Sequence, residues 1–269
     1  MLEVDGLTFS YQRGGPNVLD GISFSASSGR LIALLGENGA GKSTLFRCLL
    51  GFEKNYRGTI RLLGTDIRRM TRKSIASAVA YVPQSETPVF NYSVFTTVLM
   101  GTTGTMPALA SPGEDQIRSA EEAINFLDIS GLADRGINEI SGGERQLAML
   151  ARAIAQRSKI MIMDEPTANL DYGNQQLVLR HIKSMTNEGY TVIFSTHNPE
   201  HALQYASHVL VIKDHRIAAD GPTEDALTES LIRKIYGLDA KIIRVPVAGR
   251  TVKSCIPIED GIGQRRSDQ

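Results

Sequence analysis

The sequence predicts an α/β fold built around a mostly parallel sheet, and three observations support this prediction. Short apolar or β-branched segments alternate with segments of helical periodicity along most of the 269 residues. Several strand segments are apolar throughout, which is typical of strands covered on both faces. The alternation stops between about residues 85 and 157, where we find helices and loops but no convincing strand. This break indicates a helical insertion into the α/β core.

The elements follow one another in a simple order. The N-terminal segments "LEVDGLTFSY" and "GISFSASSG" suggest short strands joined by turns, and therefore an antiparallel β patch. Later strands are predicted at 30–36, 59–64, 78–83, 159–165, 190–196 and 208–214. Helices are predicted at 42–50, 116–128, 143–156, 173–187, 199–206 and 223–236.

These elements predict one principal domain over residues 1–240. Its core comprises 1–84 and 158–240, and a helical subdomain over 85–157 is inserted between the two parts. Residues 241–269 form a C-terminal extension that ends in "GIGQRRSDQ", and it is expected to be weakly structured and partly disordered from 241 onward.

Composition excludes several classes of protein. Lys+Arg and Asp+Glu both number 29, so the net charge favours neither nucleic acid nor an anionic membrane surface as a partner. Two cysteines indicate neither a disulfide framework nor a zinc site. The longest apolar runs are far shorter than the ~20 residues of a membrane helix. We therefore expect a cytoplasmic protein whose membrane role, if it has one, comes through a partner.

A phosphate-binding loop is predicted at "GENGAGKST" (36–44), which matches G-x-x-x-x-G-K-[ST] at Gly36, Gly41, Lys42 and Ser43. It lies between an apolar strand and a helical segment, as the motif requires. Backbone N–H groups and the helix N-terminus attract phosphate, the lysine adds a charge, and the serine hydroxyl can ligate Mg²⁺. The motif alone predicts only nucleotide binding, because kinases, GTPases and motor ATPases share it.

Two acids end the buried segment "IMIMDEP". Asp164 is placed to hold Mg²⁺ through the waters bound to the ion. Because side chains alternate in direction along a strand, Glu165 points away from Asp164 and is placed to orient or deprotonate the attacking water. A pair of solvated acids at a strand end is the alternative. His197 and Gln84 also follow strands, as candidates for contacts with the γ-phosphate, Mg²⁺ or water, although either residue taken singly is a weak signal.

The segment "ISGGERQ" begins a helix with two glycines, each of which costs roughly 0.5–1 kcal/mol relative to alanine inside a helix. A capping box formed by Ser141 and Glu144 explains those two residues but leaves Gly142 and Gly143 unexplained. Glycines would expose backbone N–H groups to a phosphate. Both interpretations stay open.

With these segments in order, residues 2–240 resemble the nucleotide-binding subunit of ATP-binding cassette (ABC) transporters. Tyr11 resembles the aromatic residue that stacks on adenine, "VPQ" the Q-loop, "ANLD" the D-loop, and "STH" the switch histidine. "GENGAGKST" resembles Walker A, "IMIMDEP" Walker B, and "ISGGERQ" the family signature. The resemblance implies ATP contacts from Tyr11, Gly36, Asn38, Gly39, Gly41, Lys42, Ser43 and Thr44, and Mg²⁺ contacts from Ser43, Gln84 and Asp164.

The resemblance also implies how the chain works. Glu165, His197 and Gln84 would serve hydrolysis, while Ser141, Gly142, Gly143 and Asp171 would contact the ATP of a second copy. The working unit would be a homodimer on the cytoplasmic face of the membrane, bound to a separate polytopic permease and, through it, to a substrate-binding protein.

Two segments of the sequence narrow the expected class of transporter and of transported substrate. "NYSVFTTVLMG" and the region after His197 resemble subunits that serve iron-chelate, haem or cobalamin importers, with departures at Thr102 and Asn198, where that family usually has Arg and Asp. Importers of molybdate, tungstate or metal ions, and exporters, remain alternatives. A soluble ABC ATPase of DNA repair or translation, or a small-molecule kinase, is less consistent with these motifs.

Overall fold

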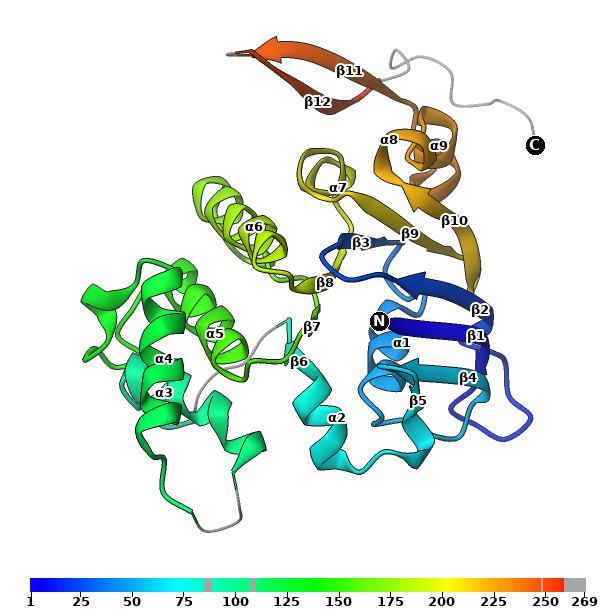
Figure 1. Cartoon of the computed structure of the whole chain (residues 1–269). Helices are drawn as coiled ribbons and strands as arrows, with labels where there is room; N and C mark the ends of the chain where they lie inside the picture. The colour runs from blue at the N-terminus through cyan, green and yellow to red at the C-terminus, as the bar shows by residue number, and fades with distance from the viewer. Residues whose placement is uncertain (85–88, 107–109, 248, 259–269) are drawn as a thin grey trace, which may run out of the picture.

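The computed structural model describes residues 1–84, 89–106, 110–247 and 249–258, and is organised around two sheets (Figure 1). The larger sheet has six strands in the order β10-β9-β3-β8-β7-β6 and is parallel except for β10. Its strands are β3 (Leu31–Leu35), β6 (Val79–Val82), β7 (Ile160–Met163), β8 (Thr191–Thr196), β9 (His208–Lys213) and β10 (Arg216–Pro222). The predicted α/β class with a mostly parallel sheet is confirmed.

The smaller sheet is antiparallel and has the order β2-β1-β4-β5. Its strands are β1 (Leu2–Phe9), β2 (Leu19–Ala26), β4 (Arg57–Leu62) and β5 (Thr65–Asp66). The predicted N-terminal antiparallel patch is therefore present. It also includes the strand expected at 59–64, because β4 pairs with β1 rather than with the parallel sheet.

The central strand β3 explains why its sequence is apolar throughout. Leu31, Ala33 and Leu35 contribute to a core shared with helices on one face of the large sheet. Ile32 and Leu34 contribute to a second core shared with α1 (Lys42–Leu49) and the antiparallel sheet. Alternate side chains of one strand thus enter two cores, as expected for a strand covered on both faces.

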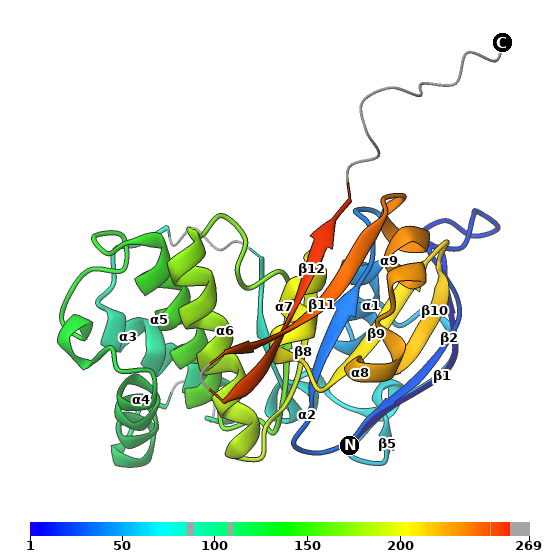
Figure 2. The same cartoon turned by 90° about the horizontal axis from the view of Figure 1, so that it is seen from above.

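The helices of the inserted region lie together to one side of the sheets in both views (Figures 1 and 2). They are α3 (Val94–Leu99), α4 (Glu114–Phe126) and α5 (Gly142–Ala155), with 3-10 turns at Met100–Thr105 and Ser130–Leu132. Within the described parts of 85–157 there is no strand, only an isolated bridge between Ser93 and Gly136. The boundaries 85 and 157 stay a prediction.

The remaining helices are α2 (Arg72–Ala78), α6 (Tyr172–Asn187), α7 (Pro199–Tyr205), α8 (Thr223–Ala226) and α9 (Glu229–Tyr236), with a 3-10 turn at Ile67–Arg69. One expectation was wrong here, and several elements were not predicted. The helix predicted at 223–236 is two helices, because Thr228 caps α9 through the amide of Leu231. The short helices α2 and α3 were missed, as were β10 and the pairing of β4.

The C-terminal extension is more ordered than expected. Strands β11 (Ala240–Val247) and β12 (Arg250–Pro257) form a hairpin that lies across α7 (Figures 1 and 2). Its inner face places Ile242 and Cys255 against the core, and its polar groups bond to the body, as in the 3.0 Å contact from Ser254 Oγ to Glu200. The expectation of a weakly structured extension is therefore wrong for 241–257. The expected disordered tail at 259–269 lies outside the described residues.

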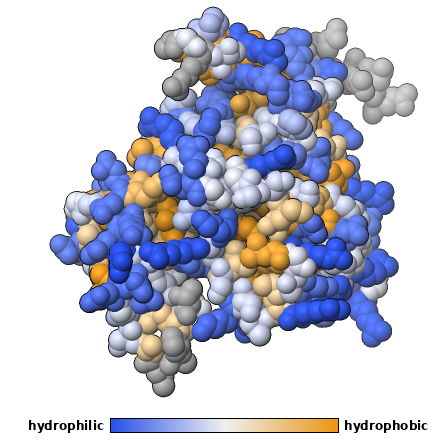
Figure 3. All heavy atoms as spheres, viewed as in Figure 1, coloured by the Kyte–Doolittle hydropathy of each residue, from blue (hydrophilic) through white to orange (hydrophobic). Residues whose placement is uncertain are grey.

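Hydrophilic residues cover most of the face shown in Figure 3. Among the described residues, no helix is both long enough and apolar enough to cross a membrane.

Candidate functional site

Strand order brings the candidate residues together. In the large sheet β3, β8, β7 and β6 are parallel neighbours, so their carboxyl ends lie in a row. The phosphate-binding loop follows β3, His197 follows β8, the two acids follow β7, and Gln84 follows β6. The carboxyl edge of an open α/β sheet is where such folds bind ligands.

The loop 36–44 bounds a cavity of about 370 Å³. Gly41, at the start of α1, has φ 106°, and a Cβ built there would lie 2.8 Å from the carbonyl oxygen of Val18. A side chain would therefore be strained and would collide with the cavity wall. The cavity is lined by Val18, Asn38, Gly39, Gly41, Lys42, Ser43, Thr44, Gln84, Glu165 and His197.

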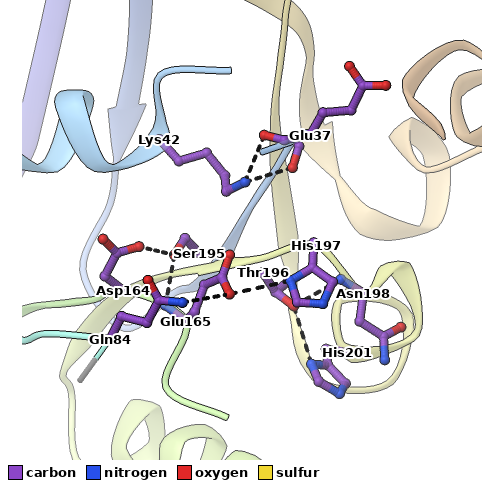
Figure 4. A network of polar contacts seen from close by, with 11 residues as sticks. Glu37, Lys42, Gln84, Asp164, Glu165, Ser195, Thr196, His197, Asn198 and His201 are labelled. Atoms are coloured by element: carbon purple, nitrogen blue, oxygen red, sulfur yellow. Dashed lines mark hydrogen bonds and ion pairs between the residues drawn. The ribbon is translucent and has the colours of Figure 1, made fainter. Parts of the chain in front are cut away.

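Lys42 is buried at the base of this loop. Its Nζ donates to the carbonyl oxygens of Gly36 at 2.7 Å and Glu37 at 3.0 Å (Figure 4). Burial lowers the pKa of Lys42, and the carboxylates of Glu165 and Asp164 oppose that change. The ammonium group thus sits within the loop, at the point where an anionic phosphate would compensate its desolvation.

One oxygen of Glu165 is the meeting point of the three predicted catalytic residues. Its Oε2 accepts a hydrogen bond from Gln84 Nε2 at 3.3 Å and lies 3.4 Å from Nδ1 of His197 (Figure 4). Glu165 has φ 44°, an uncommon conformation for a residue with a side chain. This carboxylate can accept a proton from a water molecule held between it and a phosphate.

Ser195 is a residue that the sequence analysis missed. It lies fully buried in β8, where its Oγ donates to Oδ1 of Asp164 at 2.6 Å and accepts from the amide N–H of Glu165 at 2.8 Å. One hydroxyl therefore orients both acids (Figure 4). In the sequence, Ser195 stands out as a polar residue inside an otherwise apolar strand. Its role could be inferred only by knowing that β8 lies beside β7.

The oxygen donors at the site suit a hard cation. Ser43 and Gln84 line the cavity, and the carboxylate of Asp164 is buried beside Glu165. Hydroxyl, amide and carboxylate oxygens are ligands that Mg²⁺ accepts, and phosphate oxygens and waters would complete its octahedron. The residues present therefore fit the Mg²⁺ ion that binds together with a nucleoside triphosphate.

Tyr11 lies at the edge of the site. Its hydroxyl is 3.1 Å from Oγ1 of Thr44, which lines the cavity, and its ring packs edge-on against Phe9. The Tyr11 side chain is 58% exposed, so a flat face is open for stacking.

The residues expected to act on a second copy lie elsewhere. Among the described residues, Ser141, Gly142, Gly143 and Asp171 do not line the cavity. Ser141 and Glu144 form the capping box of α5, with Glu144 Oε2 accepting from the Ser141 amide at 2.8 Å. Asp171 caps α6 by accepting from the amide of Asn174 at 2.9 Å.

Hydrogen bonds at the start of α7 and at the end of β8 anchor the loop that contains His197. Asn198 caps α7 by accepting from the Glu200 amide at 2.9 Å, a role that Asp would also fill, so the departure noted at this position keeps the cap. Thr196 Oγ1 accepts from the Asn198 amide and lies 3.3 Å from Nδ1 of the buried His201 (Figure 4). Burial, with a smaller contribution from His197, lowers the pKa of His201 to about 4.

Comparison with known proteins places the chain in a family. Residues 19–168, more than half of the chain, match the sequence model described as "ABC transporter". The chain belongs to the ABC transporter family. Its resemblance to the ATP-binding subunit of these transporters is confirmed, and so is ATP hydrolysis coupled to transport as its class of activity.

Individual relatives of this ABC transporter ATPase cover nearly all of it. The hemin import ATP-binding protein HmuV of Rhodococcus jostii is 36% identical over 93% of this chain and 85% of its own length. A probable iron chelatin transport ATP-binding protein of Helicobacter pylori is 36% identical over 88% of this chain and 92% of its own. A solved chain described as a metal-chelate type ABC transporter in an inward-facing conformation superposes with a TM-score of 0.85 at 30% identity, covering 96% and 98%.

Proposed function

We propose that this ABC ATPase hydrolyses ATP with Glu165 as the residue that polarises the attacking water, assisted by His197 and Gln84. The observation that supports this assignment is the convergence of Gln84 Nε2 and His197 Nδ1 on one oxygen of Glu165, inside the cavity lined by the phosphate-binding loop. Lys42 and the backbone amides near Gly41 would hold the phosphates, and Tyr11 would stack on the base.

Mg²⁺ bound with the nucleotide would be held by Ser43, Gln84 and Asp164, and would neutralise charge on the phosphates. The protein's own part is to keep Asp164 in one orientation. The Ser195 hydroxyl does this through its 2.6 Å bond to Oδ1.

The working unit in this proposal is a homodimer. Cassettes of this family dimerise and work with a membrane permease, and the cavity of one chain does not include Ser141, Gly142, Gly143 or Asp171 among its described lining residues. A second copy would supply these residues to the phosphates, at the capped N-termini of α5 and α6. Each site would then contain groups from both chains.

The composite site is tested by Ser141→Arg. Placing a long cation at the start of α5 should block ATP-driven dimerisation and turnover while the monomer keeps its ATP affinity. Light scattering and nucleotide titration measure the two properties. Normal ATPase activity in this variant would disprove the contribution of Ser141 to a second subunit's site.

We place the dimer on the cytoplasmic face of the membrane, docked to a separate permease through the inserted region. Exposed apolar side chains there support this assignment, with Val89 88%, Phe90 64% and Tyr92 44% exposed. These side chains follow Gln84 in the chain. The residues that would contact a permease are therefore close in sequence to the residue that contacts Glu165.

The cargo in this proposal is an iron chelate or haem, delivered to the permease by a substrate-binding protein. Support comes from the named relatives in Rhodococcus and Helicobacter. A Listeria manganese transport ATP-binding protein, 32% identical over 88% of this chain, favours a free metal ion as the second candidate. Uptake into vesicles that hold this ATPase and its permease, with haem, an iron chelate and Mn²⁺ offered separately, distinguishes the two.

A further inference from the structure

Helices α5 and α6 lie side by side (Figure 2), and Gly143, in the first turn of α5, lies against Asn174, in the first turn of α6. A Cβ built on Gly143 would lie 2.5 Å from both Cγ and Oδ1 of the Asn174 side chain. Gly143 is buried and Asn174 is half-buried. The amide group of Asn174 therefore occupies the space that any larger residue at position 143 would need.

Asn174 cannot simply turn away to relieve such a collision. Its Nδ2 donates to Oδ2 of Asp171 at 2.7 Å, and its backbone amide donates to Oδ1 of the same carboxylate at 2.9 Å. These bonds lower the pKa of Asp171, the backbone bond contributing most. Separately, Gln175 Nε2 donates to the carbonyl oxygen of Leu170 at 2.9 Å, which joins the start of α6 to the residue before Asp171.

The two glycines of "ISGGERQ" therefore serve different purposes. Gly142 is exposed, and among the described residues a Cβ there would meet Leu170 alone, at an ordinary 3.8 Å. Within the part of the chain that the structure describes, no packing requires a glycine at that position, so its backbone is open to a ligand there. Gly143, by contrast, is a glycine because Asn174 packs against it.

We propose that Asn174 is a positioning residue that joins the start of α5 (141–143) to Asp171, so that the two segments move as one unit. The inference rests on the proposed function, in which Ser141, Gly142 and Asp171 all face the nucleotide of a second copy. The two segments come from loops about thirty residues apart, and the Asn174 side chain contacts both. Without it, each segment would have to be ordered separately when the dimer closes, which costs conformational entropy.

The test uses the full chain in a Glu165→Gln background, which should hold ATP and form a stable dimer. Adding Asn174→Ala should raise the dimer dissociation constant with saturating ATP by about tenfold, the scale of coupling between contacting residues. The monomer's ATP affinity and its thermal midpoint should change little. Asn187→Ala, an exposed asparagine at the other end of α6, is the matched control and should behave as the parent.

Hydrogen exchange gives a readout that a general loss of stability would not mimic. In Asn174→Ala, amides of 141–145 and 168–174 should exchange faster, while those of β3 and β8 stay protected. Asn174→Asp keeps the shape but places a second carboxylate beside Asp171, so it should weaken dimerisation at least as much. Unchanged dimerisation in both variants would overturn the inference.

A double-mutant cycle tests the packing contact itself. Gly143→Ala should lower the thermal midpoint of the monomer, and should lower it much less when Asn174 is already alanine. Equal effects in the two backgrounds would refute the contact. If the Glu165→Gln parent fails to dimerise with ATP, the proposed composite site fails instead, so the two failures are distinguishable.

Discussion

The hydroxyl of Ser195 lies 2.6 Å from Oδ1 of Asp164, and both groups are buried at the carboxyl ends of neighbouring strands. A hydroxyl that donates to an ionised carboxylate makes one of the stronger hydrogen bonds in proteins. Because the same oxygen accepts from the Glu165 amide at 2.8 Å, the hydroxyl also fixes the backbone of the proposed catalytic glutamate. Removal of the Ser195 hydroxyl should therefore weaken both Mg²⁺ binding and activation of the attacking water.

Ser195→Ala should therefore raise the Mg²⁺ concentration needed for half-maximal ATPase activity by about tenfold, since a hydrogen bond to a charged group is worth roughly 1.5–3 kcal/mol. Titration of a fluorescent ATP analogue against Mg²⁺ gives the same comparison without turnover. Affinity for the analogue in EDTA should not change.

Ser158→Ala is the matched control for that experiment. Ser158 is also buried, 1% exposed, and its Oγ donates to the carbonyl oxygen of Ser77 at 3.2 Å, just before the start of β7. It should lose comparable stability without any change in Mg²⁺ dependence. The same Mg²⁺ requirement in Ser195→Ala and in the unmodified protein would contradict the assigned role.

Glu165→Gln should keep ATP affinity and lower the rate of hydrolysis by about 10²–10⁴, the usual contribution of a general base. The substitution preserves size but removes the acceptor of the water's proton. Phosphate release at saturating ATP measures the effect, with Glu188→Gln, an exposed residue beyond α6, as control. Near-normal turnover would mean that another group activates the water.

The part of this site that could be predicted consists of residues in short, contiguous sequence motifs. The phosphate-binding loop needs only a strand, a short glycine-rich segment and a helix, all contiguous in sequence. Asp164 and His197 could be proposed because each directly follows a strand, and Glu165 because it follows Asp164. The capping box at Ser141 was equally local and is present.

Residues whose role depends on tertiary neighbours could not be predicted in this way. Ser195 matters only because β8 lies beside β7, and Asn174 only because α6 packs against Gly143. The hairpin β11–β12 was missed for the same reason, since its strands are stabilised by contacts with α7 and with Glu200. Strand order and helix packing carry this information, and no short segment contains it.

Tyr11→Ala should weaken ATP binding by about tenfold, because stacking of a base on an aromatic ring contributes roughly 1–3 kcal/mol. Tyr11→Phe keeps the ring and removes only the hydroxyl that contacts Thr44 at 3.1 Å, so it should bind nearly as well as the unmodified protein. Calorimetric titration with an ATP analogue measures both. Equal affinity in all three proteins would exclude stacking on Tyr11.

His201 should make the fold sensitive to mild acid. Burial lowers its pKa to about 4, whereas in the unfolded chain the imidazole has its ordinary value of 6.5. Between these values the unfolded state binds more protons, so stability falls as the pH decreases from 6.5 toward 4. At pH 5 the loss relative to pH 7.5 should be about 2 kcal/mol from this residue. Nδ1 of His201 lies 3.3 Å from Oγ1 of Thr196, the residue directly before His197, so protonation of the ring would alter this contact.

His201→Asn isolates this contribution. Asparagine places an amide group near the position of Nδ1, where it can donate to or accept from the Thr196 hydroxyl, and it does not titrate. Urea unfolding at pH 7.5 and pH 5 should show the unmodified protein losing about 2 kcal/mol more than the variant, while every other titrating group is common to both. An equal loss in the two proteins would mean that folding does not change the pKa of His201, and would contradict the assigned effect of its burial.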